Sequence, residues 1–405
     1  MHAPQREFTV VDNELIVGGT AVFELMQRSD GRPFYAYDSG VIDDTIAALK
    51  QRLPGRIRLH YAMKANPMPE VVAHVARGAD GLDVASAREL ALARATGVAP
   101  GDISFAGPGK SAQDLHAAVD AGVILAIESA TEARRIAAIA AEKGVTAPCA
   151  IRVNPDFELR SSGMKMGGGA RPFGIDAEQV PAILESLRGT SLDIRGFHIF
   201  SGSQNLRPEA IVETQARTVE LAGRLAPHLP DGLRWLNIGG GLGVPYFPGD
   251  EPLDLDVVAT ALAELLDKHA ALLASTEVVM ELGRYLVAAA GIYACRVTDK
   301  KVSRGTTYLV TNGGLHHNLS LSGNFGQVIR KNYPVAIANR VASDELERVT
   351  IVGPLCTPLD LLGENMLLPK ADIGDTIAVF MSGAYGFTAS PHRFLSHPEA
   401  LEFFL

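Results

Sequence analysis

Residues 57–67 read Ile-Arg-Leu-His-Tyr-Ala-Met-Lys-Ala-Asn-Pro. The mostly apolar stretch 57–63 is followed directly by a lysine, Lys64. Residues 81–96 begin with a second apolar stretch, Gly-Leu-Asp-Val-Ala, and continue as an alanine-rich segment with apolar side chains three and four positions apart. The two apolar stretches are typical of buried strands. The alanine-rich segment that follows the second stretch is typical of an amphipathic helix. Alternation of strand and helix indicates a parallel sheet.

The same alternation extends over residues 34–285. The strand candidates are residues 33–37, 57–63, 81–85, 103–106, 123–127, 149–153, 194–200, 233–238 and 277–281. Eight or nine such units in roughly 250 residues fit a closed (β/α)8 barrel, similar to a TIM barrel, better than an open dinucleotide-binding sheet. The glycine run 239–243 also follows a strand, but it does not spell the dinucleotide fingerprint.

The pattern changes after residue 286. Strand-like runs now follow one another without long helices, which predicts a mostly antiparallel β domain. Residues 8–17, with a turn at residues 12–14, are also expected to be strands and to join the C-terminal sheet. We therefore expect N-terminal strands over 1–33, a barrel over 34–285 and a β domain over 286–405.

Composition and charge exclude several classes of protein. Hydrophobic residues make up 47% and the net charge is -9 without a basic stripe, so nucleic acid is an unsuitable partner for this globular chain. The beginning of the chain lacks the apolar core of a signal peptide, and charged residues interrupt the apolar segment 258–274, so we expect no membrane span. The three cysteines have neither zinc-ligand nor disulfide spacing. We expect a cytoplasmic enzyme without a metal.

Chemically capable residues follow the predicted strands, at the carboxyl ends where a (β/α)8 barrel carries its active site. Taken singly, each has an ordinary explanation: a lysine at a strand end is usually solvated, and a triple glycine is usually a tight turn, although its amides can bind phosphate. Together they form a ring that points to catalysis. The ring consists of Lys64, Asp83, Arg152, Asn154, His198, residues 201–204, Gly239, Gly240, Gly241 and residues 281–284.

Several stretches resemble, in order, the motifs of the fold-type III pyridoxal phosphate-dependent decarboxylases, the family of ornithine, diaminopimelate and arginine decarboxylases. The resemblance covers nearly the whole chain. It implies an alanine racemase-like fold, pyridoxal 5'-phosphate as the cofactor, and removal of the α-carboxylate of an amino acid. The motifs are Tyr61-Ala-Met-Lys-Ala-Asn-Pro67, Leu82-Asp-Val-Ala-Ser86 with Glu89, Gly202-Ser-Gln204, Gly239-Gly-Gly241, Glu281-Leu-Gly-Arg284, Gly353-Pro-Leu-Cys356 with Asp360, and Gly383-Ala-Tyr385.

The resemblance also implies roles for individual residues. Lys64 would bind the cofactor as a Schiff base. Glu281 would face the pyridine nitrogen and keep it protonated, which strengthens the ring as an electron acceptor and favours decarboxylation over racemisation. Asp83, Arg152, His198 and Phe200 would contact the cofactor. The phosphate would be held by Ser203, Gly239, Gly240, Gly241, Gly283, Arg284 and Tyr385.

Cys356 stands where the family has a cysteine that the partner subunit contributes and that reprotonates the carbanion. This implies a homodimer with shared active sites. The alternative for a free cysteine is a buried small hydrophobic residue.

Three positions depart from the family's pattern. Phe200 replaces a histidine that stacks on the cofactor; an aromatic ring can still stack, but it cannot donate a hydrogen bond. Thr357 replaces an acidic residue after the cysteine, and Gly313 aligns with a second carboxylate that ornithine decarboxylases have. An ammonium group buried without a partner is costly. Ornithine and lysine are therefore poor candidate substrates, and the case for diaminopimelate as the substrate is weakened.

The sequences Phe-Ser-Gly-Ser-Gln (200–204) and Cys-Thr-Pro-Leu-Asp (356–360) resemble a divergent branch of the family. It includes exosortase-associated decarboxylases and decarboxylases of a glutamyl group tethered to a carrier protein. The partner is thus expected to be a small-molecule amino-acid substrate, either free or tethered to a carrier protein. Candidate contacts are His316, Arg330, Thr357 and Asp360, with solvated loop residues as the alternative for His316, His317, Asn318 and Arg330.

Three other functions remain open at this point. They are diaminopimelate decarboxylation proper, racemisation on the same fold, and binding of pyridoxal phosphate without turnover. Glu281 and Cys356 argue against a racemase. The second domain argues against a binding protein, because such proteins resemble the barrel alone.

Overall fold

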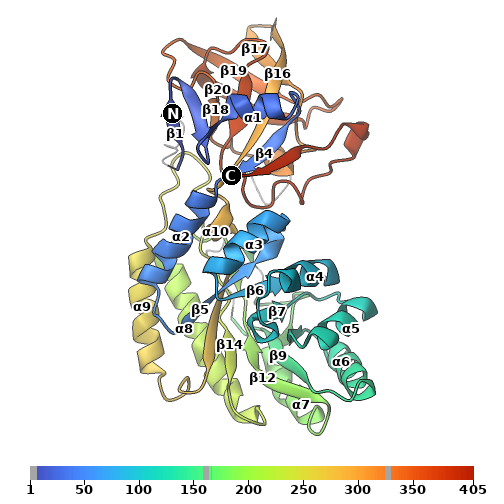
Figure 1. Cartoon of the computed structure of the whole chain (residues 1–405). Coiled ribbons are helices and arrows are strands. Elements are labelled where there is room, and N and C mark those ends of the chain that lie inside the picture. Colours follow the sequence, from blue (N-terminus) through green and yellow to red (C-terminus); the bar gives the residue numbers. More distant parts are fainter. Residues whose placement is uncertain (1–6, 158–163, 166, 324–329) are drawn as a thin grey trace. The chain divides into compact units, whose positions relative to one another are not determined.

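The computed structural model describes residues 7–157, 164–165, 167–323 and 330–405 (Figure 1). The chain forms two compact units. The unit that we call the barrel unit comprises residues 46–244 and 252–283. The remaining residues form the unit that we call the β unit.

Eight parallel strands form the barrel. Each pairs with the next along the chain, and the last pairs with the first, so the sheet closes on itself. This confirms the predicted (β/α)8 barrel. The strands are β5 (Ile57–Ala62), β6 (Gly81–Val84), β7 (Ile103–Phe105), β8 (Ile124–Ile127), β9 (Ala147–Asn154), β12 (Leu192–His198), β14 (Trp235–Asn237) and β15 (Glu277–Leu282). Three short strands accompany them, β10 (Met164–Lys165), β11 (Ile175–Asp176) and β13 (Gly202–Ser203).

A helix follows each of the first seven barrel strands. These helices are α3 (Pro69–Gly78), α4 (Ala87–Ala95), α5 (Ala112–Ala121), α6 (Ala130–Glu142), α7 (Val180–Ser186), α8 (Pro208–Leu225) and α9 (Leu255–Lys268), and α2 (Ser39–Arg52) precedes β5. Serines 86, 111 and 129 accept hydrogen bonds from the free backbone amides at the beginnings of α4, α5 and α6. Within the described residues, no helix has the length and apolar character needed to cross a membrane.

Large side chains fill the barrel interior. Ile124, Ala150, Trp235 and Val279, from four different strands, form one buried cluster. The barrel is therefore a packed core rather than a pore, and polar groups can reach solvent only beyond its ends.

One strand that was predicted for the barrel belongs to the β unit instead. The strand expected over 33–37 as the first of the series is β4 (Phe34–Tyr37), and it belongs to the β unit, where it pairs with β16 (Gly291–Ser303) and β22 (Leu401–Phe404). All four of its residues are buried. A strand buried on both faces reads as a continuous apolar run in any sheet, so the sequence could not tell which sheet it joins.

The main sheet of the β unit is mostly antiparallel, as predicted; among the described residues, its parallel pairings are those of β17 with β19 and of β22 with β4. Helices α1 (Val22–Arg28) and α10 (Arg284–Val287) also belong to this unit. The other strands of the sheet are β17 (Thr306–Thr311), β18 (Val335–Ile337), β19 (Leu346–Val352), β20 (Leu361–Pro369) and β21 (Thr376–Val379).

The N-terminal strands form a small sheet of their own. β1 (Thr9–Val11), β2 (Glu14–Val17) and β3 (Thr20–Ala21) form a three-stranded sheet, and among the described strands they do not extend the C-terminal sheet as expected. Asp12 and Asn13 both have positive φ, which fits the tight turn predicted there. A hydrogen bond from the amide of Leu15 to the carbonyl of Ala338 connects this small sheet to the rest of the β unit.

We expect Ser111→Ala to destabilise the barrel unit by about 1 kcal/mol, because Ser111 and Asp114 form a reciprocal capping box at the beginning of α5. Urea unfolding followed by the fluorescence of Trp235, the only tryptophan, measures this change within the barrel core. The control is Gln113→Ala at an exposed position of the same helix. Equal stability of the two variants would contradict the assigned capping role.

Candidate active site

Lys64 meets two buried carboxylates at the ends of barrel strands. It follows β5 in the short helix η1 (Met63–Ala65), and its Nζ lies 3.5 Å from Glu281 Oε1 and 3.8 Å from Asp83 Oδ2. The lysine side chain is 44% exposed, whereas those of Asp83 and Glu281 are 1% and 4% exposed. The structure thus places an accessible amine above two acids, from three strands that the sequence analysis had singled out.

Glu281 is held as a carboxylate. Burial by itself would raise its pKa, but the Lys64 ammonium and the contact with His198 hold the pKa well below its usual range. His198 Nε2 lies 3.3 Å from Glu281 Oε2, and Asn237 Nδ2 donates a hydrogen bond of 3.2 Å to the same oxygen. An ionised carboxylate at this depth can accept a proton or a hydrogen bond from a ligand.

Asp83 differs from Glu281 although the two lie close together. Its burial raises its pKa well above the usual range, and the negative charge of Glu281 raises it further. Ser104 Oγ donates a hydrogen bond of 3.0 Å to Oδ1, while Oδ2 has no hydrogen-bond partner among the described residues. The two adjacent carboxyl groups thus have opposite pKa shifts, upward for Asp83 and downward for Glu281.

Gly239, Gly240 and Gly241 form a cradle directly after β14. Gly239 and Gly241 have φ of 70° and 94°, and a side chain at Gly240 would overlap the carbonyl oxygen of Glu281. The amide of Gly239 already donates to Asn237 Oδ1 at 2.8 Å. It is therefore not available to the phosphate, contrary to the role expected for Gly239. The amides of Gly240 and Gly241 have no acceptor among the described residues. Two such N–H groups at a turn are suited to an anion.

His198 and Phe200, which are both expected to contact the cofactor, differ in environment. His198 is 3% exposed, and burial lowers its pKa, so it is a neutral imidazole beside Glu281. Phe200 packs against Gly239, where a Cβ would lie 2.8 Å from Phe200 Cδ2. The contacts of both residues with the cofactor stay predictions.

Arg152 has a partner that the sequence analysis missed. Its Nη1 donates a hydrogen bond of 2.7 Å to Glu128 Oε1, and its guanidinium lies 5.1 Å from the ring centroid of Phe173. Glu128 directly follows β8, so it satisfies the strand-end criterion that selected the other residues. Applying that criterion to every strand would have found it.

Ser203 and Gly283 lie beyond the carboxyl ends of β12 and β15, as the sequence predicted. Ser203 is part of β13 and is partly exposed. Gly283 directly follows β15, and a Cβ there would lie 2.8 Å from the carbonyl oxygen of Ala62. Their expected contacts with phosphate stay predictions.

In the β unit, Arg284 and Tyr385 lie together, as their common expected role requires. Arg284 begins α10, and its guanidinium carbon lies 4.7 Å from the Tyr385 ring centroid. Arg284 Nη1 also donates to the hydroxyl of Tyr246 at 2.8 Å. Tyr246 was not predicted, because it follows the glycine run in a loop that no motif marks.

Cys356 is exposed, whereas Cys149 and Cys295 are buried. Burial raises the pKa of the Cys149 thiol and raises that of Cys295 to about 12, so both are inert structural thiols. The alternative of a buried hydrophobic residue is therefore wrong for Cys356. Thr357, which follows it, is partly exposed.

Asp360 has a structural environment rather than that of a substrate contact. It is 3% exposed and accepts hydrogen bonds from the amides of Leu315 at 2.7 Å and Leu355 at 2.8 Å. The carboxylate thereby ties together the loops that carry Gly313 and Cys356. We do not retain it as a substrate residue.

His316 and Arg330 are not the solvated loop residues of the alternative interpretation. His316 is completely buried, with its ring centroid 3.8 Å from that of His317, and burial lowers its pKa to about 3. Arg330 is partly buried and its Nε donates to the carbonyl of Leu321 at 3.2 Å. A neutral, enclosed His316 is unsuited to pairing with a substrate charge.

Gly313 lies in a space with no room for a side chain. A Cβ there would overlap the hydroxyl of Tyr293 and lie 3.0 Å from Cβ of Cys295. The packing of the sheet thus excludes a carboxylate from the position where ornithine decarboxylases have one.

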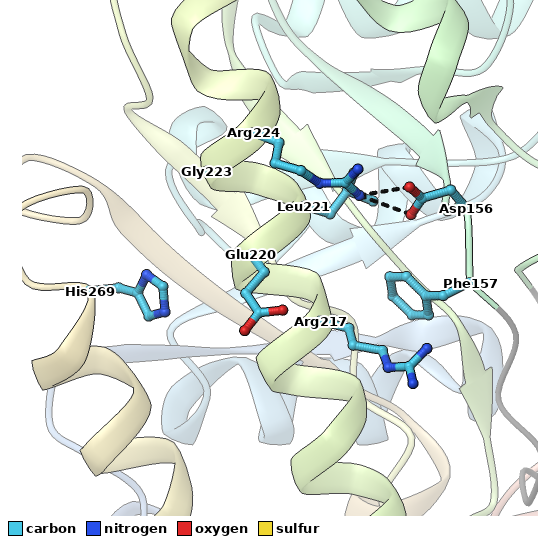
Figure 2. Close-up of a pocket in the computed structure, with 8 residues that line it drawn as sticks. All are labelled: Asp156, Phe157, Arg217, Glu220, Leu221, Gly223, Arg224 and His269. Carbon is cyan, nitrogen blue, oxygen red and sulfur yellow. Dashed lines mark hydrogen bonds and ion pairs between the residues drawn. The ribbon is translucent and has the colours of Figure 1, made fainter.

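A separate hollow on the barrel unit contains none of the predicted residues. Figure 2 shows Arg224 and Asp156 joined by two hydrogen bonds at its edge, of 3.0 and 2.7 Å. Arg217 lies 5.6 Å from the ring centroid of Phe157. Both arginines of this hollow thus contact other groups of the protein, and we do not assign a catalytic role to the hollow.

The chain is similar to known decarboxylases along most of its length. Residues 39–288 match the family model described as pyridoxal-dependent decarboxylase, pyridoxal binding domain. The L-glutamyl-[BtrI acyl-carrier protein] decarboxylase of Niallia circulans is 36% identical over 91% of this chain and 88% of that protein. The diaminopimelate decarboxylase of Archaeoglobus fulgidus is 32% identical over 95% of this chain and 90% of that protein.

Solved structures agree with the sequence matches. The diaminopimelate decarboxylase of Helicobacter pylori, crystallised with L-lysine, has a TM-score of 0.83 and 27% sequence identity, over 95% of this chain and 94% of that one. The family model covers well over half of the chain, including the lysine and the carboxylates that meet at the barrel strand ends. The chain therefore belongs to the family of pyridoxal phosphate-dependent decarboxylases.

Proposed function

We propose that this decarboxylase removes the α-carboxylate of an amino acid whose side chain carries no distal ammonium. The substrate that we favour is a glutamyl group carried on a carrier protein. The observation that carries the proposal is the packing around Gly313, which leaves no room for a counter-charge.

The second expected counter-charge is missing as well. Thr357 follows Cys356 where diamino-acid decarboxylases have an acidic residue. Asp360, the nearest carboxylate along the chain, is buried and hydrogen-bonded to two backbone amides. An ammonium group bound here would lose its hydration without gaining a partner, which is unfavourable by several kcal/mol.

The similarity to the Niallia circulans enzyme supports the glutamyl group, since that protein's name states a carrier-bound glutamyl substrate. The 32% identity to a diaminopimelate decarboxylase supports diaminopimelate as the second candidate. The two candidates differ in the distal group, which is an uncharged thioester in one and carries both an ammonium and a carboxylate in the other.

The residues at the barrel strand ends fit pyridoxal phosphate. The fit includes an accessible amine at Lys64, an ionised carboxylate at Glu281 and free amides at Gly240 and Gly241. The cofactor, when bound, accepts the electron pair that departing carbon dioxide leaves behind. We assign the covalent attachment to Lys64 and the phosphate contacts to Gly240, Gly241, Ser203 and Gly283. Arg284 and Tyr385 of the β unit remain predicted phosphate contacts.

Glu281 would hold the proton of the ring nitrogen. Lys64, His198 and Asn237 keep its carboxylate ionised and oriented, so the proton that it attracts stays on the ligand. Burial raises the pKa of Asp83, which disfavours a second negative charge next to Glu281. We propose Cys356 as the acid that delivers a proton to the α-carbon after carbon dioxide has left.

Cys356 would act in the active site of a partner subunit. Its exposure, together with that of Leu359, which is 57% exposed, supports a homodimer with shared sites. All three cysteines are unpaired, which suits the reducing cytoplasm.

We expect the cofactor-loaded protein to release carbon dioxide from glutamate or a glutamyl thioester, and not from ornithine, lysine or meso-diaminopimelate. A panel assay of carbon dioxide release measures this, and chiral analysis of unreacted substrate detects racemisation. Release from diaminopimelate or lysine would show that another residue supplies the missing charge. Racemisation alone, or no turnover of any kind, would contradict decarboxylation itself.

We expect Glu281→Gln to lower kcat at least about 100-fold with the cofactor still bound, because the amide cannot hold the ring nitrogen's proton. The matched control is Glu277→Gln at the opposite end of the same strand. Steady-state kinetics and the cofactor's absorbance measure both variants. A similar loss in both would mean that Glu281 acts only through the stability of β15.

We expect Lys64→Ala and Cys356→Ala, each nearly inactive, to regain activity when they are unfolded and refolded together. In a random mixture half of the dimers are mixed, and each of these has one site with both residues intact, so about a quarter of the wild-type activity returns. Native mass spectrometry counts the mixed dimers. Mixed dimers without activity would contradict shared sites.

A further inference from the structure

Arg284 of the β unit is a partly buried cation with few partners. Its guanidinium has five N–H groups. Among the described residues, the one acceptor for these groups is the hydroxyl of Tyr246, which lies 2.8 Å from Nη1, and no described carboxylate forms an ion pair with the guanidinium. A cation with open donors and no acidic partner is suited to binding an anion.

Tyr246 is a neutral partner for this cation. Burial raises the pKa of its hydroxyl, so the phenol stays protonated and leaves the positive charge of Arg284 uncancelled. A carboxylate in its place would also hold the guanidinium, but it would compete with an anionic ligand for the charge. The tyrosine hydroxyl therefore orients the cation without neutralising it.

Aromatic packing holds Tyr246 and Arg284 in place. Tyr246 is 4% exposed, and its ring centroid lies 5.4 Å from that of Tyr333 and 6.0 Å from that of Phe247. The rings of Tyr333 and Phe247 also pack against each other, at 5.3 Å, so these three residues form one aromatic cluster. The guanidinium carbon of Arg284 lies 5.4 Å from the ring centroid of Tyr246 and 4.7 Å from that of Tyr385. The direction of the guanidinium is thus set by fixed neighbours.

We propose that Tyr246 is a positioning residue that orients the Arg284 guanidinium for the phosphate of the cofactor, and that it thereby contributes to the preference for the phosphorylated form of the cofactor. Arg284 supplies the charge, and the hydroxyl of Tyr246 fixes the direction of its N–H groups. The inference rests on the proposed phosphate contact of Arg284, but neither on the choice of substrate nor on the role of Cys356.

The aromatic cluster provides a matched control. Tyr333 packs edge-on against Tyr246, but its hydroxyl forms a hydrogen bond with Ser320 instead of Arg284. Tyr246→Phe and Tyr333→Phe each remove one buried hydroxyl and keep the ring, whereas only Tyr246→Phe removes a contact with the guanidinium. A difference between the two variants therefore separates the hydrogen bond to Arg284 from general damage to the cluster.

The test compares the binding of pyridoxal phosphate with that of pyridoxal, which lacks the phosphate, to the full-length protein freed of its cofactor. Titrations followed by the cofactor's absorbance give a Kd for each ligand, and thermal unfolding of the free protein checks the fold of each variant. We expect Tyr246→Phe to raise the Kd of pyridoxal phosphate about five- to tenfold and to leave that of pyridoxal within about twofold, because one hydrogen bond of the phosphate-binding cation is lost. Arg284→Gln should act in the same way and more strongly, and Tyr333→Phe should change neither Kd.

A loss of affinity in Tyr246→Phe that is confined to pyridoxal phosphate, with wild-type values in Tyr333→Phe, supports the proposal. Unchanged affinity in Tyr246→Phe together with weakened binding in Arg284→Gln overturns the role of Tyr246 but keeps the phosphate contact of Arg284. Wild-type affinity in Arg284→Gln overturns both. An equal loss for the two ligands, or in the two tyrosine variants, overturns the positioning role as well. If Tyr246→Phe folds poorly, Arg284→Lys tests the same point, because it keeps the charge without the planar fork and should still weaken the binding of pyridoxal phosphate; wild-type affinity in Arg284→Lys would refute the need for orientation.

Discussion

The pairing of β15 with β5 closes the barrel, and the rest of the site depends on it. Glu281 lies opposite His60 in this register, so the strand end that carries Glu281 is brought to the one that leads into Lys64. Lys64 and Glu281 are 217 positions apart in the chain, yet Lys64 Nζ and Glu281 Oε1 lie 3.5 Å apart. A slip of one residue in this register would turn the Glu281 side chain out of the barrel interior.

The mouth of the barrel holds more charge than a packed interior normally tolerates. Glu281, Glu128 and Glu132 are each buried, and each is matched by a cation, Lys64, Arg152 or Lys110. Asp83 shares Lys64 with Glu281, at 3.8 Å, and burial together with the charge of Glu281 raises its pKa. Buried charges of this kind contribute little net stability, but they fix side chains in one arrangement.

The β unit places a different restriction on the chemistry. The hydroxyl of Tyr293 fills the space beside Gly313, and Asp360 is committed to the amides of Leu315 and Leu355. Polar groups are present, but none of these offers a free negative charge. The proposed selectivity against diamino acids would thus rest on packing and on the loss of a counter-charge, rather than on a new repulsive group.

The sequence by itself determined the barrel, the antiparallel second sheet and the residues at the strand ends, because the period of apolar residues and the position of polar residues after each strand are local properties. Ordered motifs added the cofactor and the family. Tertiary structure alone decided that β4 belongs to the second sheet and that Gly239 donates its amide to Asn237. It also decided that Asp360 is buried and that Glu128 holds Arg152. Each of these depends on which distant segment lies opposite, and no local pattern encodes the identity of a partner.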